Sequence, residues 1–355
     1  MQNASATIPQ NELLIRAIRG EPTGRAPVWF MRQAGRSDPE YNRLKAEAGM
    51  ALEDLFRHPE WAARLSLLPK RIGVDAIIFF QDILTPLAPM GAYFRFAPGP
   101  VLDKPIGAAA DADRLALFDV GDELSFVPET FRLLKTELNG ALPILGFAGA
   151  PLTLAVFLAE GRSFGREAPR MSAFMRSDPK ALRRLLQKLT DMTIDYLKLQ
   201  AEAGAAAVQL FESAAPLLTA EAYREFALPY QQQILDAMRD VAPTIVFSRD
   251  WTGLSDLSAA GADVISLPAA VSLEEARAQF GPDQPLQGNL DNRLLAHGEW
   301  EDIERAVAEC LAAGQAQGHI FNLSHGLLRD TPFDRVRRVV EIVRDTRFPI
   351  SASAS

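Results

Sequence analysis

Cysteine is almost absent from the sequence: Cys310 is the single one among 355 residues. One thiol cannot close an intrachain disulfide, and it cannot supply the set of thiolates that a zinc cluster or an iron–sulfur site needs. Histidine is scarce as well, with four in the chain, and no H-E-x-x-H motif occurs. These absences argue against a strong metal site built by the protein, while a carboxylate site for a hard cation stays open. We expect Cys310 to be a small, buried apolar residue.

Long hydrophobic runs are also lacking. The longest apolar runs, within residues 75–80 and 142–150, fall far short of the ~20 residues that a membrane-spanning helix needs. The first ten residues are polar and carry neither a basic start nor the apolar stretch of about 7 to 15 residues that a secretory signal requires. We therefore expect a cytoplasmic protein that has no membrane partner.

Positive charge is in deficit, because 37 Lys and Arg stand against 45 Asp and Glu, which gives a net charge of -8 and a pI of about 5.2. General nucleic-acid binding requires a concentrated basic face, so nucleic acid is not an expected partner. The nucleotide-binding patterns G-x-G-x-x-G after the first strand and G-x-x-x-x-G-K-[ST] are missing too. An anionic ligand would need a local basic pocket on an acidic protein.

What the sequence does contain is a regular alternation of strand-like and helix-like segments. Eight short apolar runs are bounded by Gly, Pro, Asp or Ser, and each is followed by a longer stretch with helical spacing. These runs are residues 26–30, 75–80, 142–147, 206–211, 244–247, 262–267, 285–288 and 319–323. Their apolar continuity suits parallel strands covered on both faces. Eight alternations in a chain of this length predict an α/β protein with a single (β/α)8 TIM barrel, and an open doubly wound sheet is the alternative.

Two of the segments between the runs carry clear helix signals. Residues 178–204 begin with Asp178 as a possible N-cap and Pro179 in the first turn, and they end at Gly204. Residues 219–241 begin with a threonine that has glutamates nearby, which suits a helix start. We expect one helix over each of these two segments.

No low-complexity linker, fixed-period repeat or strong change of composition divides the chain. We expect one catalytic barrel domain over residues 1–350 and a frayed C-terminal tail over residues 351–355. The surplus length relative to a minimal barrel lies in residues 83–107 and 153–179. Both segments would overhang the catalytic end of the barrel.

Charged residues follow the first two runs, at the strand ends where a parallel barrel builds its active site. Arg32 and Arg36 are four residues apart after the first run, and each guanidinium can hold a carboxylate through two hydrogen bonds. The alternative is a pair of surface arginines bound to Asp38 or Glu40. Asp82, after the second run, could stabilise a cation developing on a nitrogen-bearing ligand, or it could cap the next turn.

Other strand ends give weaker signals. Residues 146–153 are rich in small residues that allow a ligand or a helix to approach closely. Ser213 follows the fourth run, and His325 follows the eighth and precedes a glycine. A lone histidine is more often a structural hydrogen-bonding residue than a catalytic one, but this strand-end position shifts the balance towards function. No G-x-S-x-G elbow exists, so covalent catalysis by a serine is not expected.

Together these segments resemble the uroporphyrinogen decarboxylase family over nearly the whole chain. The shared motifs, in order, are PVWFMRQAGR (27–36), QDIL (81–84), GFAGAPLTL (146–154), LFES (210–213), FALPY (226–230), LQGNLD (286–291) and NLSHG (322–326). The resemblance implies a (β/α)8 barrel that often forms a homodimer and needs no cofactor and no metal. It also implies a carboxy-lyase of haem biosynthesis that converts the acetate arms of uroporphyrinogen III to methyl groups, giving coproporphyrinogen III.

The resemblance also implies roles for individual residues. Asp82, Arg32 and Arg36 would be catalytic, with Asp82 contacting the central pyrrole NH groups and the two arginines binding carboxylates. Ser213 and His325 would hold peripheral carboxylates. The full set of implied substrate-binding residues is Arg32, Gln33, Ala34, Gly35, Arg36, Asp82, Phe147, Gly149, Phe157, Ser213 and His325.

The sequence departs from the family pattern at three places. An aromatic residue normally follows RQAGR, where this chain has Ser37. The helix after GFAGAP usually presents a tyrosine where Phe157 stands, so one hydroxyl is lost, which would weaken a hydrogen bond by ~1 kcal/mol. The family reads GLDW where residues 266–269 are Ser-Leu-Pro-Ala.

Three alternatives follow. One is a zinc-dependent methyltransferase that shares the barrel, but it needs thiolate and imidazole ligands, and Cys310 lies in a helix-like stretch. Another is a diverged paralogue that binds a tetrapyrrole or another anionic ligand without turning it over, motivated by Ser37, Phe157 and Pro268. A structural interaction module fits least, because scaffold proteins do not require charged residues to gather at one end of a barrel.

Overall fold

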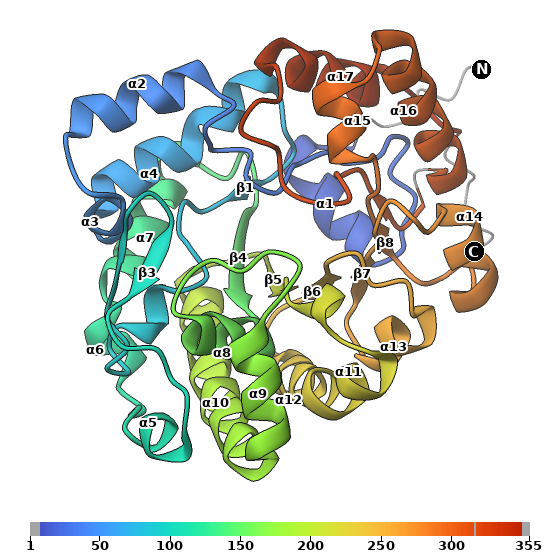
Figure 1. The fold of residues 1–355 in the computed structure, drawn as a ribbon. Coiled ribbons are helices and arrows are strands. Elements are labelled where there is room, and N and C mark those ends of the chain that lie inside the picture. Colours follow the sequence, from blue (N-terminus) through green and yellow to red (C-terminus); the bar gives the residue numbers. More distant parts are fainter. Residues whose placement is uncertain (1–7, 316, 350–355) are drawn as a thin grey trace, which may run out of the picture.

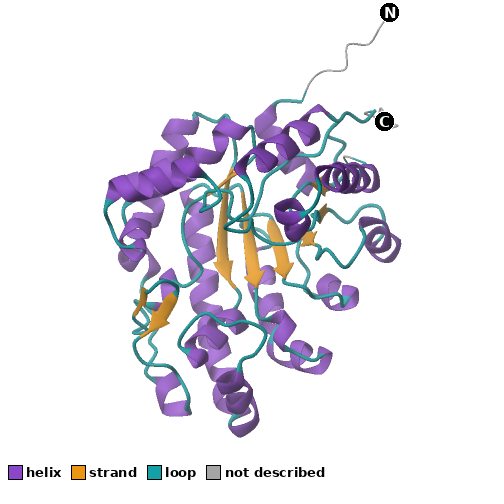
Figure 2. Cartoon of the chain, turned by 45° about the horizontal axis from the view of Figure 1, so that its top comes forward, coloured by secondary structure: helices purple, strands orange, loops and turns teal. Residues whose placement is uncertain are grey.

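The computed structural model describes residues 8–315 and 317–349 and has a mixed α/β fold around a curled, parallel sheet of seven strands. The strand order is β1-β4-β5-β6-β7-β8-β9, and every neighbouring pair is parallel. The strands are β1 (Ile77–Ile78), β4 (Ile144–Gly149), β5 (Ala207–Glu212), β6 (Thr244–Ser248), β7 (Val264–Ser266), β8 (Leu286–Gln287) and β9 (His319–Ile320). They stand at the centre of the molecule with helices around them (Figure 2). The predicted tail, residues 351–355, lies outside the described residues.

The helices follow the strands in the alternation that the sequence predicts (Figure 1). They are α1 (Gln10–Ile18), α2 (Pro39–Ala48), α3 (Leu52–Arg57), α4 (Pro59–Leu67), α5 (Ala109–Asp113), α6 (Val120–Glu123), α7 (Phe126–Leu138), α8 (Pro151–Glu160), α9 (Pro169–Ser177), α10 (Pro179–Ala203), α11 (Ala220–Phe226), α12 (Leu228–Met238), α13 (Leu254–Ala259), α14 (Leu273–Phe280), α15 (Asn292–His297), α16 (Trp300–Gly314) and α17 (Phe333–Asp345), with short 3-10 turns η1 (Leu68–Ile72), η2 (Thr85–Leu87) and η3 (Ala215–Leu217). None of the helices within the described ranges is long and apolar enough to cross a membrane.

The first predicted run, residues 26–30, does not form a regular strand but still lies alongside the sheet. Val28 makes a parallel bridge with Phe321, and the Phe321 N–H donates to the Pro27 carbonyl at 2.8 Å. On its other side, the Asp75 N–H donates to the Val28 carbonyl at 2.7 Å. Proline has no N–H to add to a strand ladder, which limits the pairing of this segment. It nevertheless bridges the segment after β9 and the segment before β1.

A buried polar network also joins this segment to the sheet. Trp29 Nε1 donates to Gln287 Oε1 at 3.1 Å, and Gln287 Nε2 donates to Gln209 Oε1 at 3.0 Å and to Ser266 Oγ at 3.1 Å. All four side chains are inaccessible to solvent. Because buried polar groups are costly unless paired, this network fixes how β5, β7 and β8 meet the first segment. It also gives Ser266, one of the departures from the family pattern, a structural partner.

The helix predictions were confirmed for one segment and partly for the other. Helix α10 starts at Pro179, the Asp178 carboxylate accepts from the Ala181 N–H at 2.9 Å, and Gly204 ends it with φ of 113°. The segment 219–241 instead holds two helices, α11 and α12, that separate at Ala227. Pro229 explains the break, since a proline cannot donate the backbone bond that would continue α11.

The two predicted insertions contact one another. Residues 83–107 contain a β-hairpin, β2 (Phe94–Phe96) paired antiparallel with β3 (Pro100–Leu102). The Leu102 N–H donates to the Gly161 carbonyl at 2.8 Å, and Val101 makes an antiparallel bridge with Arg162, just after α8. Both insertions follow the carboxyl ends of strands, so they join over that end of the sheet (Figure 1).

Cys310 is buried on α16, as predicted. Its thiol donates to the Gly288 carbonyl at 3.3 Å, and His319 Nε2 lies 2.7 Å from the same oxygen. Burial raises the pKa of Cys310 to about 12 and lowers the pKa of His319 to about 4. Both groups are therefore uncharged parts of the packing at neutral pH.

Candidate active site

The turn that carries Arg32 and Arg36 is held rigidly to the sheet. The Gln33 amide donates to the Ala76 carbonyl at 3.0 Å and accepts from the Phe30 N–H at 3.0 Å. Gln33 is only 2% exposed, so its side chain serves the backbone on both sides of the turn. The backbone of Arg32 has φ of 62°, a left-handed conformation that residues other than glycine adopt only where the surroundings impose it.

Two glycines make this turn possible. A Cβ on Gly35 would lie 2.8 Å from the Arg32 carbonyl oxygen, and a Cβ on Gly326 would lie 2.6 Å from Arg32 Cδ. Gly35 belongs to the RQAGR motif and Gly326 to the NLSHG motif, far apart in sequence. The Leu327 N–H donates to the Met31 carbonyl at 3.0 Å, which fixes the two motifs side by side.

Arg32 and Arg36 are not engaged by the carboxylates that could have claimed them. Asp38 is bound to Arg71 and accepts from the Glu40 N–H at 2.8 Å, while Glu40 pairs with Arg43 at 2.7 Å. The alternative of a surface ion pair with Asp38 or Glu40 is therefore wrong.

Arg32 lies close to other cations and is still accessible to solvent. Burial, followed by the charges of Arg36 and Arg249, lowers the pKa of Arg32, although the side chain remains accessible to water. The carboxyl end of the sheet, where Arg32 remains accessible to water, is called the opening below. Cations crowded there without an anion would gain from binding one.

Asp82 follows β1 and both predicted roles are compatible with its position. Its carboxylate accepts from the Leu84 N–H and from the Thr85 hydroxyl, the latter at 3.0 Å, so it does cap the turn that begins η2. Burial raises the pKa of Asp82 to about 6, against the opposing effect of these hydrogen bonds. The residue as a whole is half-buried, so part of it still reaches solvent.

A row of aromatic rings crosses the sheet near these charged residues. Successive ring centroids lie 5.1 Å apart for Phe79 and Phe147, 5.7 Å for Phe147 and Phe211, 5.5 Å for Phe211 and Phe247, and 5.7 Å for Phe247 and His325. This chain of contacts runs from the segment after β1 through β4, β5 and β6 to the segment after β9. Such a row of rings offers a ligand an apolar surface to pack on.

His325 is a neutral hydrogen-bond donor in this arrangement. The Gly326 N–H donates to His325 Nδ1 at 2.7 Å, so the ring proton is on Nε2. Burial, followed by the charges of Arg32 and Arg249, lowers the pKa of His325 to about 4. The ring can therefore donate from Nε2 to a carboxylate at neutral pH without carrying charge itself.

Ser213 is positioned by Thr153 of α8, the helix that follows the neighbouring strand β4. Thr153 Oγ1 accepts from the Ser213 N–H at 2.7 Å and from the Ala214 N–H at 3.1 Å, and it donates to Glu212 Oε1 at 2.5 Å. Glu212 is inaccessible to solvent, and burial raises its pKa to about 7. The start of α8 thus fixes the loop that carries Ser213.

The remaining implied residues are placed less directly. Gly149 ends β4 where a Cβ would lie 2.8 Å from Leu154 Cδ2 and 3.1 Å from Ile83 Cβ, so its absence lets α8 approach. Phe157 is 2% exposed on α8 and packs edge-on against Phe94 of the hairpin at 5.9 Å. Phe157 therefore joins α8 to the insertion that covers the opening.

Two residues with perturbed pKa values were missed by the sequence analysis, Glu212 and Arg249. Burial lowers the pKa of Arg249, which follows β6. Its signal in the sequence was its place directly after the fifth apolar run, the same place that identified Asp82 after the second.

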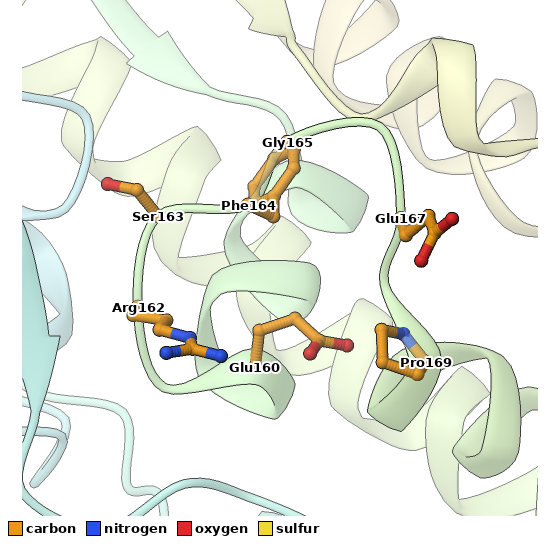
Figure 3. A pocket seen from close by; sticks show the side chains of 7 residues that line it. All are labelled: Glu160, Arg162, Ser163, Phe164, Gly165, Glu167 and Pro169. Carbon is orange, nitrogen blue, oxygen red and sulfur yellow. The ribbon is translucent and has the colours of Figure 1, made fainter.

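One pocket in the described part of the chain lies outside the site residues named above (Figure 3). It is formed by the loop that arches from the end of α8 to the start of α9, and its lining residues are Glu160, Arg162, Ser163, Phe164, Gly165, Glu167 and Pro169. Glu160 accepts from the Met171 N–H at 2.9 Å and so anchors the base of the arch. Acidic and basic side chains alternate in this pocket, so its lining favours neither sign of charge.

Comparison with known proteins agrees with this geometry. The uroporphyrinogen decarboxylase (URO-D) family model matches residues 9–346. A uroporphyrinogen decarboxylase from Syntrophotalea carbinolica is 39% identical over 340 residues, which cover 95% of this chain and 98% of that protein. One from Thermus thermophilus is 41% identical over 341 residues, covering 94% and 98%.

The fold has counterparts among solved structures of other activities. A methyltransferase from Methanosarcina mazei superposes with a TM-score of 0.75 at 19% identity, covering 95% of this chain and 98% of that one. Identity this low shows a shared fold alone. The sequence matches are far stronger and extend over almost the entire chain, and they show that the chain belongs to the uroporphyrinogen decarboxylase family.

Proposed function

We propose that this protein is a carboxy-lyase that removes carbon dioxide from the four acetate arms of uroporphyrinogen III and releases coproporphyrinogen III. The observation that carries the proposal is the half-buried Asp82 after β1 together with Arg32 and Arg36 after the neighbouring segment 26–30, two arginines that form no ion pair within the described residues. A substrate that is a ring of pyrrole N–H donors with carboxylates around its edge requires this pairing of central anion and peripheral cations.

The fold that supports this chemistry is a complete (β/α)8 barrel in one domain. Residues 26–30 take the eighth strand position of the barrel, since they bridge Phe321 on one side and form a hydrogen bond with Asp75 on the other. The buried network through Trp29 and Gln287 supports closure from inside. By the same family resemblance, we infer a cytoplasmic homodimer.

Each decarboxylation exchanges carbon dioxide for a proton. Protonation of the pyrrole carbon next to the acetate-bearing carbon makes the ring a cation that can accept an electron pair. The bond to the carboxylate then breaks, carbon dioxide leaves, and the pair forms an exocyclic double bond. A second proton is added at the methylene carbon to give the methyl group, and the ring loses the first one. Asp82, in its ionised form, stabilises the cation.

The surrounding groups hold the macrocycle for these steps. Arg32 and Arg36 bind carboxylates through charge-assisted hydrogen bonds. His325 donates a hydrogen bond from Nε2, and Ser213 adds a hydroxyl at the end of β5. The lowered pKa of Arg32 favours it as a proton donor. Gln33, Ala34 and Gly35 act by shaping the turn, and Phe147, Gly149 and Phe157 by shaping the wall.

The test is anaerobic incubation of the purified protein with freshly reduced uroporphyrinogen III, without added metal or cofactor, followed by oxidation and chromatography of the products. Stepwise loss of carboxyl groups, ending at coproporphyrin III, is the expected result. Tight binding of the tetrapyrrole without product would favour the diverged paralogue instead.

Substitution of the central carboxylate makes the test specific to the site. Asp82→Asn keeps the shape and an acceptor for the Leu84 N–H but removes the charge, so we expect kcat to fall by about 100-fold or more, the usual effect of removing one electrostatic stabiliser of a transition state. Asp54→Asn, at an exposed carboxylate on α3, is the matched control and should keep full activity. Equal activity in both variants would remove the role assigned to Asp82.

A further inference from the structure

Arg249 stands at the mouth of the opening in a position comparable to that of Asp82. It follows β6 directly, and its N–H donates to the Glu212 carbonyl at 2.9 Å, which continues the β5–β6 ladder to this residue. Its backbone is therefore fixed by the sheet. A side chain on a rigid strand end is presented in a defined direction, as a binding residue needs to be.

The charge of Arg249 reaches residues from both ends of the chain. It is one of the charges that lower the pKa of Arg32, after the first predicted run, and of His325, after the last. β6 is the fifth of the eight runs, so in the closed barrel proposed above it stands opposite the first. The contact between Phe247 and His325, at 5.7 Å, shows that side chains from β6 do meet those after β9. Arg249 and Arg32 thus converge across the opening.

No carboxylate of the protein is bound to this guanidinium. Within the described residues, no ion pair or hydrogen bond involves the Arg249 side chain, and its Nε is buried with no partner. Glu212 and Asp250 are near enough to raise the pKa of Arg249. Glu212 Oε1, however, accepts hydrogen bonds from Thr153 and Ala214 and not from Arg249. A half-buried cation without a partner is costly, and an arriving anion would relieve that cost.

One wall of the space around Arg249 is aromatic. The guanidinium carbon lies 5.9 Å from the centre of the Phe164 ring, within the range of a cation–π contact. Figure 3 shows Phe164 on the arching loop after α8, next to Gly165. The loop thereby brings an apolar face to a cation at the rim, which would exclude water from an ion pair formed there and strengthen it.

We propose that Arg249 is a substrate-binding residue that, with Arg32, clamps one peripheral carboxylate of the tetrapyrrole, making a third guanidinium of the site. The inference rests on the function proposed above and adds to it a cation at the strand end opposite the RQAGR turn. Its ligand is a carboxylate on a flexible arm. Acetate and propionate arms share this chemistry, and they can be told apart because the product keeps only its propionates.

The experiment compares Arg249→Gln, Arg249→Lys and the control Arg166→Gln, which removes a charge from the exposed part of the same arching loop. Oxidised uroporphyrin III and coproporphyrin III serve as non-reacting fluorescent probes of binding, and uroporphyrinogen III serves for kcat and KM. Thermal unfolding of each variant establishes that it is folded. Arg249→Lys keeps the charge but loses the two-pronged geometry, so it separates binding from gross loss of structure.

We expect Arg249→Gln to raise Kd for uroporphyrin III and KM by about tenfold or more, as for a lost charge-assisted contact, with kcat changed much less. The Kd and KM of Arg249→Lys should lie between those of Arg249→Gln and those of the unsubstituted protein. The values for Arg166→Gln should equal those of the unsubstituted protein. If the clamped arm is a propionate, coproporphyrin III binding weakens equally, and if it is an acetate, only uroporphyrin III binding does.

Unchanged Kd and KM in folded Arg249→Gln, or equal losses in Arg166→Gln, would overturn the inference while leaving the proposed decarboxylase intact. A protein that neither binds the porphyrins nor decarboxylates uroporphyrinogen III before any substitution would overturn both. The two failures are therefore distinguishable in one set of measurements.

Discussion

At the scale of single residues, the site depends on groups whose protonation is set by burial. Burial raises the pKa of Asp82 to about 6, while it lowers the pKa of His325 to about 4. At neutral pH the first is mostly ionised and the second is neutral. A buried carboxylate has lost favourable interactions with water, so a cation that forms beside it stabilises its ionised form strongly.

This assignment predicts the pH dependence of turnover. If ionised Asp82 is the active form, kcat/KM should fall tenfold per pH unit below about pH 6, because the carboxyl is protonated as the pH falls through its pKa. His325 cannot cause this decline, since its pKa is about 4. Rates of uroporphyrinogen III decarboxylation between pH 5.5 and 8 would reveal the decline.

The buried Glu212, with a pKa of about 7, is the other carboxyl that titrates in this range. Glu212→Gln is therefore the control, and it should retain the decline near pH 6. A flat profile in the unsubstituted protein, or a decline that vanishes in Glu212→Gln, would contradict the role of Asp82. The effect of Glu212 on stability has the opposite pH dependence. Because the pKa of its carboxyl is raised in the folded protein, Glu212 favours the folded state at low pH, and that contribution to the free energy of unfolding is lost as the pH rises through about 7.

At the scale of elements, the start of α8 is the part on which the Ser213 loop depends. Thr153→Val removes a hydroxyl that donates to Glu212 and accepts from two backbone N–H groups, all of them buried or half-buried. We expect the free energy of unfolding to fall by about 2 kcal/mol, because partners are left unsatisfied, and kcat/KM to fall several-fold as Ser213 shifts.

A second buried threonine offers the comparison. Thr190 on α10 is also inaccessible to solvent, but its hydroxyl only donates back to the Leu186 carbonyl at 2.8 Å. Thr190→Val should change the unfolding midpoint little and leave kcat/KM unaltered. Denaturant unfolding and steady-state rates of both variants decide the matter, and equal effects at the two positions would show that α8 has no special role.

The elements also show what could be predicted from the sequence and what could not. Periodicity located the core of every strand of the parallel sheet but not the hairpin strands β2 and β3, and the caps of α10 were read correctly from Asp178 and Gly204. The single helix expected over 219–241 was wrong, because the effect of Pro229 on the preceding turn outweighs continuous helical spacing. The run at 26–30 pairs too briefly for a regular strand because Pro27 lacks a donor.

The site was predicted in the same uneven way. Motifs identify Arg32, Asp82 and His325, since each follows an apolar run. They do not include Arg249, although it also follows an apolar run, because its proposed role depends on convergence across the sheet and not on a motif. The tautomer of His325 is likewise set by a backbone N–H that only the folded turn brings to Nδ1.

At the scale of the whole molecule, the arrangement depends on how the first segment is attached to the sheet. Arg25 donates to both oxygens of Asp75, at 2.6 and 2.7 Å, and Asp75 also accepts from the Val28 N–H at 2.8 Å. Asp75 is inaccessible to solvent and Arg25 nearly so. This single carboxylate thus joins the segment that leads into the Arg32 turn to the segment that leads into β1.

Breaking that ion pair should therefore destabilise the whole fold more than it affects the chemistry. We expect Asp75→Asn to lower the free energy of unfolding by about 3 kcal/mol, because it leaves the Arg25 charge buried without its counter-charge. Asp103→Asn removes the partner of an exposed pair with Arg95 on the hairpin and should shift the unfolding midpoint little. Well below its own midpoint, Asp75→Asn should still decarboxylate. The double variant Arg25→Met, Asp75→Leu should recover part of the lost stability, since neither charge then remains buried. A double variant no more stable than Asp75→Asn would mean that the charges of the pair are not what attaches the first segment to the sheet.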